Sequence, residues 1–225
     1  MKIPRAPHSW TVSPSRAIAI QKELADRVVT SGRCGRVRLV AGADIAFTPD
    51  KSHCIAGVVV WDVRENCVVE QVVVRRPVRF PYVPGLLSFR EAPSVLTAFR
   101  MLRHEPDAFM FDGQGLAHPR RFGLACHVGM ILDRPSVGCA KSILVGSCDM
   151  PPPLRGSTTP LLHHGETIGQ AVRTRDGVRP VYVSIGHRLS LAAAVEITLL
   201  CGMRYRLPEP TRLADQLVTR ERTLR

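Results

Sequence analysis

Apolar positions follow a helical spacing near the N-terminus and then change to β-strand runs. Residues 14–30 place apolar side chains on one helical face, and Ser13 followed by Pro14 is typical of a helix start. Three runs rich in β-branched and other apolar residues follow, at 37–47, 54–64 and 67–78. Residues 64–66 connect the second run to the third and are short enough for a hairpin. The pattern predicts a helix and then an antiparallel meander of three strands.

Helices and strands alternate through the rest of the chain. We expect, in chain order, a helix at 88–103, a strand at 108–113, a helix at 122–132, strands at 135–142, 167–174 and 180–186, a helix at 190–203 and a last helix from Pro210. Residues 79–87 carry two prolines and a glycine, so they fit neither a regular helix nor a central strand. Residues 146–165 are rich in Pro, Gly, Ser, Thr and His and are predicted to be a loop.

The order of these elements indicates the fold class. Three antiparallel strands followed by strand–helix units resemble the ribonuclease H-like fold, whereas a doubly wound sheet would alternate strand and helix from the outset. We therefore expect an α/β protein with a mixed central sheet flanked by helices. A chain of 225 residues is expected to form a single domain over 1–225.

Charge and hydropathy restrict the kind of partner. Thirty-one Lys and Arg residues against nineteen Asp and Glu residues give a net charge of +12, which favours a polyanionic partner such as nucleic acid. A basic protein without such a partner is the alternative that charge alone leaves open. No apolar run approaches the roughly 18 residues that a membrane helix needs, and the N-terminus lacks the apolar core of a signal peptide. We expect a cytoplasmic protein with no membrane partner.

The seven cysteines do not suggest a metal site or a disulfide framework. They are odd in number, widely spaced and without a C-x-x-C pair, and they stand at Cys34, Cys54, Cys67, Cys126, Cys139, Cys148 and Cys201. Several lie in apolar runs, where a free thiol behaves as a small hydrophobic side chain. This usage fits a reducing compartment.

Four carboxylates are candidates for a metal site. Asp44 stands in the middle of an apolar strand, and Asp112 closes another, while Glu91 and Asp215 lie near the starts of predicted helices. A carboxylate among apolar residues must be paired, hydrogen-bonded or bound to a cation. Clustered carboxylates suit a hard cation such as magnesium or manganese. Turn, capping or dipole roles explain each residue equally well, so spacing alone leaves both interpretations open.

Five sequence blocks resemble one known family. Residues 80–91 read FPYVPGLLSFRE and closely resemble the endonuclease V signature PYIPGLLSFRE, with Val83 in place of Ile. Residues 112–125, DGQGLAHPRRFGLA, are similar to a second block of that family. Further blocks resemble the family at 138–142, 183–191 and 206–215. The blocks fall in family order, and the likeness covers residues from about 37 to 215.

The resemblance implies roles for the charged residues. Asp44, Glu91 and Asp112 match the family's metal-binding carboxylates, and Asp215 matches a fourth position that is Asp or His among members. Lys141 matches the family's active-site lysine. A compact ammonium at that position suits the charge that develops at an attacked phosphate.

The resemblance also implies a site for the damaged base. Tyr82 and its neighbours Pro81, Val83 and Pro84 match a wedge that enters the nucleic acid at the lesion. A pocket for a flipped hypoxanthine is implied by Gly85, Gly113, Gly115 and Gly138. Candidate walls or a lid are Gln114, Leu87, Leu144 and His118, of which His118 could instead contact phosphate or the metal.

Other basic residues flank these blocks. The nucleic-acid backbone is expected to contact Arg75, Arg76, Arg79, Arg120 and Arg121, although a solvated surface charge explains each one singly. His163 and His164 lie in the predicted loop and are expected on the surface.

The implied activity is a DNA repair endonuclease. It hydrolyses the second phosphodiester bond 3′ to deoxyinosine and leaves 3′-hydroxyl and 5′-phosphate ends, with water as the nucleophile and Mg²⁺ as the cofactor (Mn²⁺ can substitute). The expected partner is DNA containing deoxyinosine, with inosine-containing RNA or single strands as further candidates, and the protein is expected to be a monomer. Alternatives are an inosine-specific endoribonuclease of the same fold, a non-catalytic nucleic-acid-binding relative and a metal-dependent phosphatase. The charge and the Tyr82 motif disfavour the last of these.

Overall fold

Three long strands build one half of the central sheet in the computed structural model, which describes residues 1–33, 35–202 and 204–223. They are β1 (Leu39–Phe47), β2 (His53–Asp62) and β3 (Cys67–Pro77), and they pair antiparallel as a meander. The turn between β2 and β3 places Asn66 at a φ of 49°, a conformation that Asn tolerates better than most residues. The predicted meander and its hairpin connection are confirmed.

Five shorter strands complete a single sheet. They are β4 (Ala108–Phe111), β5 (Ser136–Ala140), β6 (Thr158–His163), β7 (Glu166–Val172) and β8 (Val181–His187). β4 pairs parallel to β1 and β5 pairs parallel to β4, while β8, β7 and β6 continue antiparallel. The strand order is β3-β2-β1-β4-β5-β8-β7-β6. This mixed sheet confirms the predicted ribonuclease H-like α/β class.

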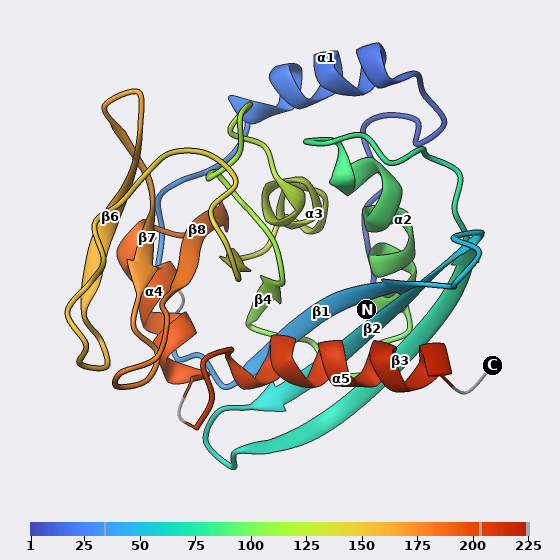
Figure 1. Cartoon of the computed structure of the whole chain (residues 1–225). Helices are drawn as coiled ribbons and strands as arrows, with labels where there is room; N and C mark the ends of the chain where they lie inside the picture. The colour runs from blue at the N-terminus through green and yellow to red at the C-terminus, as the bar shows by residue number, and fades with distance from the viewer. Residues whose placement is uncertain (34, 203, 224–225) are drawn as a thin grey trace.

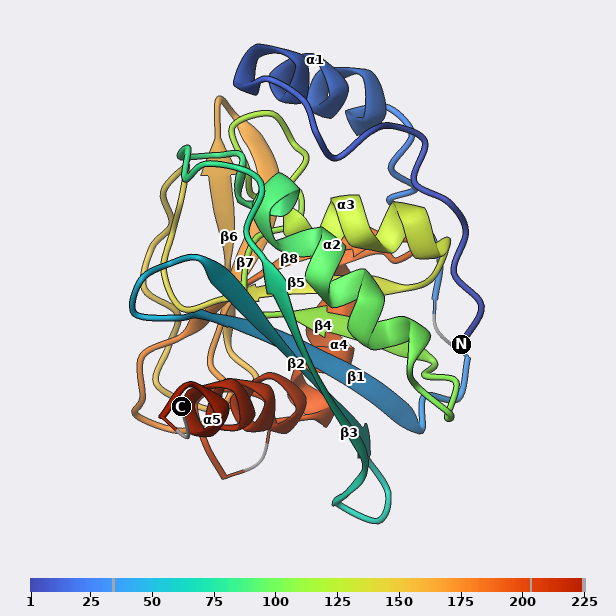
Figure 2. The same ribbon diagram turned by 90° about the vertical axis from the view of Figure 1, so that its right-hand side faces the viewer.

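Helices cover both faces of the sheet (Figures 1 and 2). They are α1 (Pro14–Ala25), α2 (Leu87–Arg100), α3 (Leu124–Leu132), α4 (Leu191–Leu200) and α5 (Glu209–Thr223). α2 and α3 lie on one face, and α4 and α5 lie on the other, as Figure 2 shows. α1 packs outside this arrangement, against the N-terminal ends of α2 and α3. Among the described residues, no helix is both long and apolar enough to cross a membrane.

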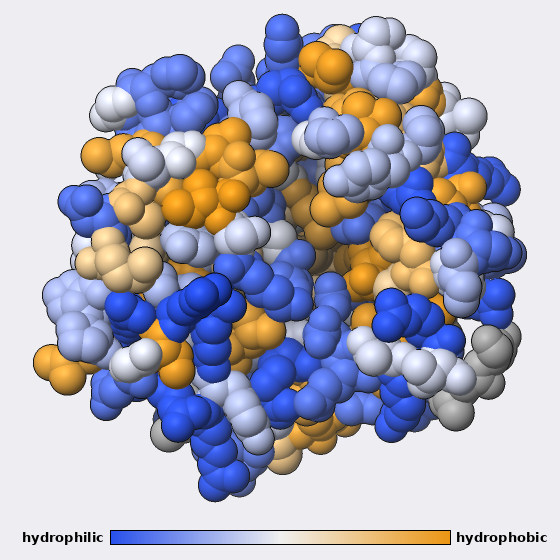
Figure 3. Space-filling view, in the orientation of Figure 1, coloured by the Kyte–Doolittle hydropathy of each residue, from blue (hydrophilic) through white to orange (hydrophobic). Residues whose placement is uncertain are grey.

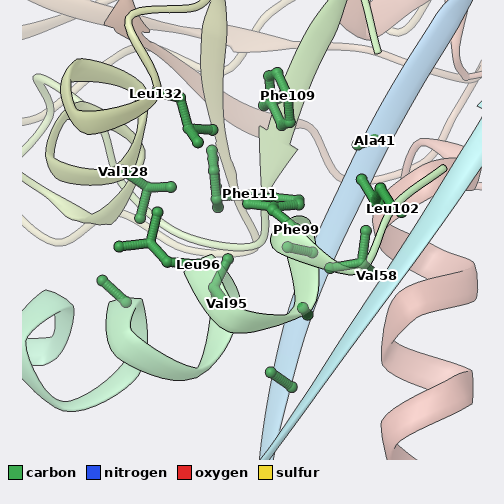
Figure 4. Close-up of a cluster of buried hydrophobic side chains, with 14 of the residues drawn as sticks. Ala41, Val58, Val95, Leu96, Phe99, Leu102, Phe109, Phe111, Val128 and Leu132 are labelled. Atoms are coloured by element: carbon green, nitrogen blue, oxygen red, sulfur yellow. The ribbon is translucent and has the colours of Figure 1, made fainter. Parts of the chain in front are cut away.

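The largest apolar cluster joins α2 and α3 to the sheet. Phe99 of α2 packs edge-on against Phe109 and Phe111 of β4, and all three side chains are fully buried (Figure 4). Burying a side chain of this size stabilises the fold by roughly 1.5–3 kcal/mol. The cluster fixes α2 beside the carboxyl end of β4, and this placement positions the site described below.

The structure corrects two of the predicted elements. The first helix ends at Ala25, not at residue 30, and Asp26 closes its C-terminus. The predicted loop at 146–165 contains the strand β6, which was missed because Pro160 disfavours strands. β6 is the last strand of the sheet, with β7 as its strand partner and a single bridge from Leu162 to Ser147 besides, so the missing N–H of Pro160 is tolerated there. His164 and Gly165 form the tight turn between them, both with positive φ.

Candidate metal and nucleic-acid site

Two of the carboxylates meet because β1 and β4 run parallel at the centre of the sheet. Ala43 lies beside Phe111 in the strand register, so the next residues, Asp44 and Asp112, emerge at neighbouring positions. The Asp112 N–H also donates a hydrogen bond to the Ala43 carbonyl at 3.4 Å. Figure 3 shows the face of Figure 1 with a hollow near its middle, bordered by both hydrophilic and hydrophobic side chains.

The third carboxylate comes from α5, which lies unusually close to β1 and β2. A Cβ on Gly42 would overlap the Pro210 carbonyl group, and a Cβ on Gly57 would lie 2.6 Å from a Val218 methyl carbon. Only glycine permits this approach of a helix to the sheet. The approach brings Asp215, five residues along the helix from Pro210, over the strand that carries Asp44.

Three carboxylates form a compact group of oxygen ligands. Oxygen atoms of Asp44, Asp112 and Asp215 lie within 4.8 Å of one another. Glu91 reaches toward the same place from α2 and lines a small cavity of about 70 Å³ together with Asp44 and Asp112. Of the four carboxylates predicted from the sequence, the structure therefore brings three into one cluster and places the fourth beside it.

The charge of this cluster is poorly compensated within the protein. Burial raises the pKa of Asp44 to about 7, and the charge of Asp112 adds to the effect. Burial also raises the pKa of Glu91 to about 8, with the charge of Asp44 as the next cause. Neighbouring carboxylates repel each other when both are charged, which disfavours their ionisation. A hard cation stabilises the charged forms, so this set of oxygen donors fits a divalent ion.

Lys141 supplies the only ammonium among the contacts described for this cluster. It directly follows β5, and its Nζ lies 2.5 Å from Asp112 Oδ2 and 3.4 Å from Asp215 Oδ1. Burial alone would lower its pKa, but the hydrogen bond and charge of Asp112 and the charges of Asp215 and Asp44 raise it overall. Lys141 is therefore held in its charged form beside the carboxylates.

The loop before α2 presents an aromatic ring to solvent. Tyr82 is 70% exposed, and its neighbours Pro81 and Pro84 are exposed as well. Val83 packs against the apolar cluster that contains Phe80, so the loop is anchored while its tip is free. Leu87 is 37% exposed and lines the carboxylate cavity. The predicted wedge residues are thus placed on a protruding loop beside the cluster.

Gly85 ends this loop and accepts three hydrogen bonds. Its carbonyl accepts from Gln21 Nε2 at 3.0 Å, His118 Nε2 at 3.0 Å and an Arg120 guanidinium nitrogen at 2.6 Å. Burial and the charge of Arg120 lower the pKa of His118 to about 4, so its ring is neutral. His118 fastens the 112–121 segment to the Tyr82 loop and lies outside the carboxylate cluster.

The remaining glycines lie where the segment after β4 packs on β5 and β8. A Cβ on Gly138 would overlap the Gly115 backbone, and the Gly115 N–H donates to Ser184 Oγ at 2.9 Å. Space is open at Gly113, where the nearest atom to an added Cβ is 4.0 Å away.

Gln114 donates to the Ser142 carbonyl at 2.9 Å and keeps a buried Oε1 that has no partner in the described part of the chain. Leu144 is 49% exposed on the segment that follows.

Comparison with known proteins identifies the family. A family model described as Endonuclease V matches residues 22–216. Endonuclease V of Roseiflexus castenholzii is 51% identical over 219 residues, which cover 97% of this chain and 98% of that protein. The chain belongs to the endonuclease V family.

Two solved endonuclease V structures share the whole fold. The crystal structure from Streptomyces avermitilis has a TM-score of 0.92 at 40% identity and covers 99% of each chain. Ciona intestinalis endonuclease V has a TM-score of 0.83 at 25% identity, covers 93% of this chain and 98% of its own, and was solved with a 24-residue DNA that contains an inosine followed by a ribo-adenosine. The common fold and the carboxylate group agree with a nuclease of the endonuclease V family, which depends on a metal.

The arginines predicted to contact DNA differ in their surroundings. Arg75 and Arg79 are exposed. Arg76 is tied to the Pro93 carbonyl and to Thr97, and Arg121 bonds to Glu166 at 3.0 Å. His163 and His164 lie at the β6–β7 turn, away from the carboxylates.

No described cysteine belongs to a metal-type cluster, and six are free thiols. Cys34 lies outside the described residues.

Sequence reasoning missed Gln21, which supports the base of the Tyr82 loop. The side chain is buried on α1 and donates to the carbonyls of Gly85 and Phe122, while its Oε1 accepts from Arg120 Nε at 2.6 Å. A signal was present in the sequence, because Gln21 stands between Ile20 and Leu24 on the apolar face of its helix. A buried amide of this kind is retained for its hydrogen bonds.

Proposed function

We propose that this protein hydrolyses the second phosphodiester bond 3′ to deoxyinosine in DNA and leaves 3′-hydroxyl and 5′-phosphate ends, with Mg²⁺ as its cofactor and Mn²⁺ as a substitute. The observation that carries the proposal is the group of Asp44, Asp112 and Asp215 oxygens within 4.8 Å, with Glu91 in the adjoining cavity. We further propose that residues 1–225 act as a single-domain monomer in the cytoplasm.

The carboxylates hold the ions, with Asp44, Asp112 and Asp215 as ligands and Glu91 beside them. A divalent ion bound there supplies Lewis acidity for the attacking water and for the leaving oxygen. Lys141 orients and stabilises the phosphate, because its ammonium is already held at the edge of the cluster. No side chain needs to become covalently attached to the substrate.

The Tyr82 loop recognises the lesion in this proposal. An exposed aromatic ring on a proline-stiffened loop can occupy the space that an extruded base leaves in the duplex. The flipped hypoxanthine enters beside Gly113, where no Cβ fills the space, with Leu87 and Leu144 as apolar walls. Hypoxanthine carries an N1–H donor that adenine lacks, and in this proposal it donates to Gln114 Oε1, which is buried and has no partner in the described part of the chain. Gly85, Gly115, Gly138 and His118 support this pocket by positioning its loops.

One experiment tests the reaction directly. A labelled duplex with one deoxyinosine is incubated with the protein and Mg²⁺, and the cut is mapped on a sequencing gel beside an otherwise identical adenine duplex. We expect a nick at the second phosphodiester bond 3′ to inosine and none in the control. A cut elsewhere, or equal cutting of both duplexes, would contradict the proposal.

An inosine-specific endoribonuclease is the second candidate, because the Ciona relative was solved with a ribo-adenosine after the inosine. The 2′-hydroxyl is the chemical difference that decides between the two substrates. Matched deoxyinosine and ribo-inosine oligonucleotides are expected to be cut at different rates, with DNA faster. Equal rates or faster RNA cleavage would favour the second candidate.

A non-catalytic nucleic-acid-binding relative is disfavoured by the presence of all four carboxylates and Lys141. The variant Asp112→Ala separates the two cases, because a catalyst loses nicking but still binds the lesion. A pure binding protein shows no nicking before the substitution either.

A further inference from the structure

A second feature lies on the opposite side of α2 from the carboxylates. Glu91 and Val95 of α2 line the carboxylate cavity, whereas Arg90, Pro93 and Arg100 line a separate groove of about 820 Å³. At 100° per residue, these two sets fall on opposite faces of the helix. The other walls of the groove are the N-terminal segment 3–11 and residues 76–80 at the end of β3, which lie on either side of α2 in Figure 2.

The groove gathers positive charge without compensation. Its lining includes five arginines and no Asp or Glu; the arginines are Arg5, Arg76, Arg79, Arg90 and Arg100. None of the five forms an ion pair with any described residue. Arg90 also keeps a buried Nε without a hydrogen-bond partner in the described part of the chain. Arg76 and Arg90 are held by backbone carbonyls, and Arg90 also stacks on Phe47, but these neutral partners do not cancel the charge. Five guanidinium groups without an ion pair around one groove repel each other, and a polyanion removes that cost.

A second arginine cluster provides an internal comparison. Arg33, Arg36 and Arg134 line a pocket on the side where β5 begins, but that pocket also contains Glu105 and Asp107. Arg134 and Glu105 form an ion pair there. Acidic residues accompany this cluster, whereas the groove beside α2 has none.

The groove is formed before any ligand arrives. His8 of the N-terminal segment lies with its Nε2 2.7 Å from Nε2 of the fully buried His127 on α3. Trp10 packs edge-on against Phe89 of α2. These contacts hold the N-terminal wall in place, so an anion can bind without ordering the segment first.

The groove also adjoins the wedge. Arg79 and Phe80 line it and are followed directly by Pro81 and Tyr82. A duplex engaged by the Tyr82 loop therefore has phosphates within reach of the groove on the side away from the carboxylates. Guanidinium groups bind phosphate oxygens with paired hydrogen bonds, which makes arginine well suited to this contact.

We propose that the arginine groove beside α2 binds backbone phosphates of the DNA flank that lies across the Tyr82 loop from the carboxylates. The inference rests on the proposed function only in taking DNA as the partner. The contacts are independent of base sequence and of the lesion. They lengthen the footprint of the protein on DNA and strengthen its binding to undamaged duplex as well.

The test is a salt titration of DNA binding in EDTA, where no cutting occurs. The variant Arg5→Gln/Arg79→Gln/Arg100→Gln removes three charges at exposed positions of the groove, and the control Arg33→Gln/Arg36→Gln/Arg134→Gln removes three charges from the other cluster. Fluorescence anisotropy gives Kd for an undamaged duplex between about 0.05 and 0.2 M NaCl. Each phosphate contact contributes about 0.9 to the slope of log Kd against log salt, so the groove variant is expected to lose about 2–3 from the slope. Its loss of affinity relative to the parent should therefore be greatest at about 0.05 M NaCl, where it is expected to exceed roughly tenfold.

The control variant is expected to change the slope by less than one third as much. Inosine-containing duplexes shortened on one side of the lesion, where the lesion fixes the position of the protein, should abolish the difference between the parent protein and the groove variant for one of the two flanks. Equal effects of the two triple variants, or an unchanged slope for the groove variant, would overturn the proposal. Nicking of inosine DNA by the parent protein is measured separately. If the parent does not cut inosine DNA but the groove variant still has the lower slope, the proposed function is overturned and the proposed role of the groove is supported.

Discussion

The Lys141 ammonium lies 2.5 Å from Asp112 Oδ2 and 3.4 Å from Asp215 Oδ1, so one cation from the protein touches two of the three clustered carboxylates. This contact places a positive charge beside the carboxylates and partly neutralises them. In the proposed mechanism, a divalent ion would share these carboxylates with Lys141, and the substrate phosphate would be the anion that the ammonium contacts.

Removal of this ammonium is expected to slow chemistry more than binding. Lys141→Ala should lower the single-turnover nicking rate about 100-fold at saturating DNA and Mg²⁺, in the range found for lost electrostatic stabilisation of a transition state. Its Kd for the inosine duplex should change by only a few-fold. Lys22→Ala, at an exposed position of α1, is the matched control. Equal losses in rate and in binding would show that Lys141 contributes to affinity only.

Asp44 and Glu91 should each destabilise the metal-free protein as the pH rises. Burial and nearby charge raise the pKa of Asp44 to about 7 and that of Glu91 to about 8, well above the values near 4 of an unfolded chain. At these two carboxyl groups the folded state binds more protons than the unfolded state between about pH 4 and pH 8, so their contribution to the free energy of unfolding falls across this window. Mg²⁺ should oppose the fall by binding the ionised carboxylates.

Glu91→Gln isolates one part of this effect. In EDTA the variant should be more stable than the parent at pH 8 by on the order of 1 kcal/mol or more, with no gain at pH 4, where Glu91 is already protonated. Urea denaturation at a series of pH values measures the difference, and Glu65→Gln in the β2–β3 turn is the control. Parallel pH profiles for the parent and Glu91→Gln would contradict the raised pKa.

The Tyr82 ring should contribute to lesion recognition and not to folding. Tyr82→Ala is expected to weaken binding to the inosine duplex by about tenfold, because stacking of a base on an aromatic ring contributes roughly 1–3 kcal/mol. Tyr82→Phe keeps the ring and should bind like the parent. The melting temperature should be unchanged in both variants, since the side chain is 70% exposed. A Tyr82→Ala variant that binds inosine and adenine duplexes with the parent's selectivity would exclude the wedge role.

The close approach of α5 to β1 should be as important as the ligands themselves. Gly42→Ala places a methyl group into the Pro210 carbonyl and is expected to cost about 1–3 kcal/mol of stability. It should also weaken Mg²⁺ binding, because α5 carries Asp215. Gly35→Ala is the control, since nothing lies within 4 Å of an added Cβ there. Thermal denaturation measures the loss of stability, and isothermal titration with Mn²⁺ measures metal affinity. Lower stability with unchanged metal affinity would show that the position of α5 does not determine metal binding.

Local sequence patterns predicted the centre of this molecule well. Runs rich in β-branched and other apolar residues predicted β1, β2 and β3, and the positions of Asp44 and Asp112 relative to their strands followed from the same kind of pattern. The sequence blocks around Tyr82 and Gly113 identified the loops that the structure places near the carboxylates. Local pattern is sufficient here because each feature depends on residues that are close in the chain.

Features that depend on distant segments were not predictable in the same way. The position of Asp215 follows from the fit of Pro210 against Gly42 and of Val218 against Gly57, pairs that lie 168 and 161 residues apart in the chain (210 − 42 and 218 − 57). The edge strand β6 forms despite Pro160 because no further strand of the described chain pairs with its outer side, where Leu162 makes a single bridge to Ser147. The arginine groove exists because residues 3–11 cross α2, and no pattern within those residues reveals that path.

Anomalous diffraction from crystals soaked in Mn²⁺ tests the central claim most directly. The account predicts at least one strong manganese peak within about 2.5 Å of carboxylate oxygens of Asp44 and Asp112, with Asp215 or Glu91 completing the shell, and loss of that peak in Asp112→Asn. Manganese bound only elsewhere on the protein, or a peak that survives in Asp112→Asn, would contradict it.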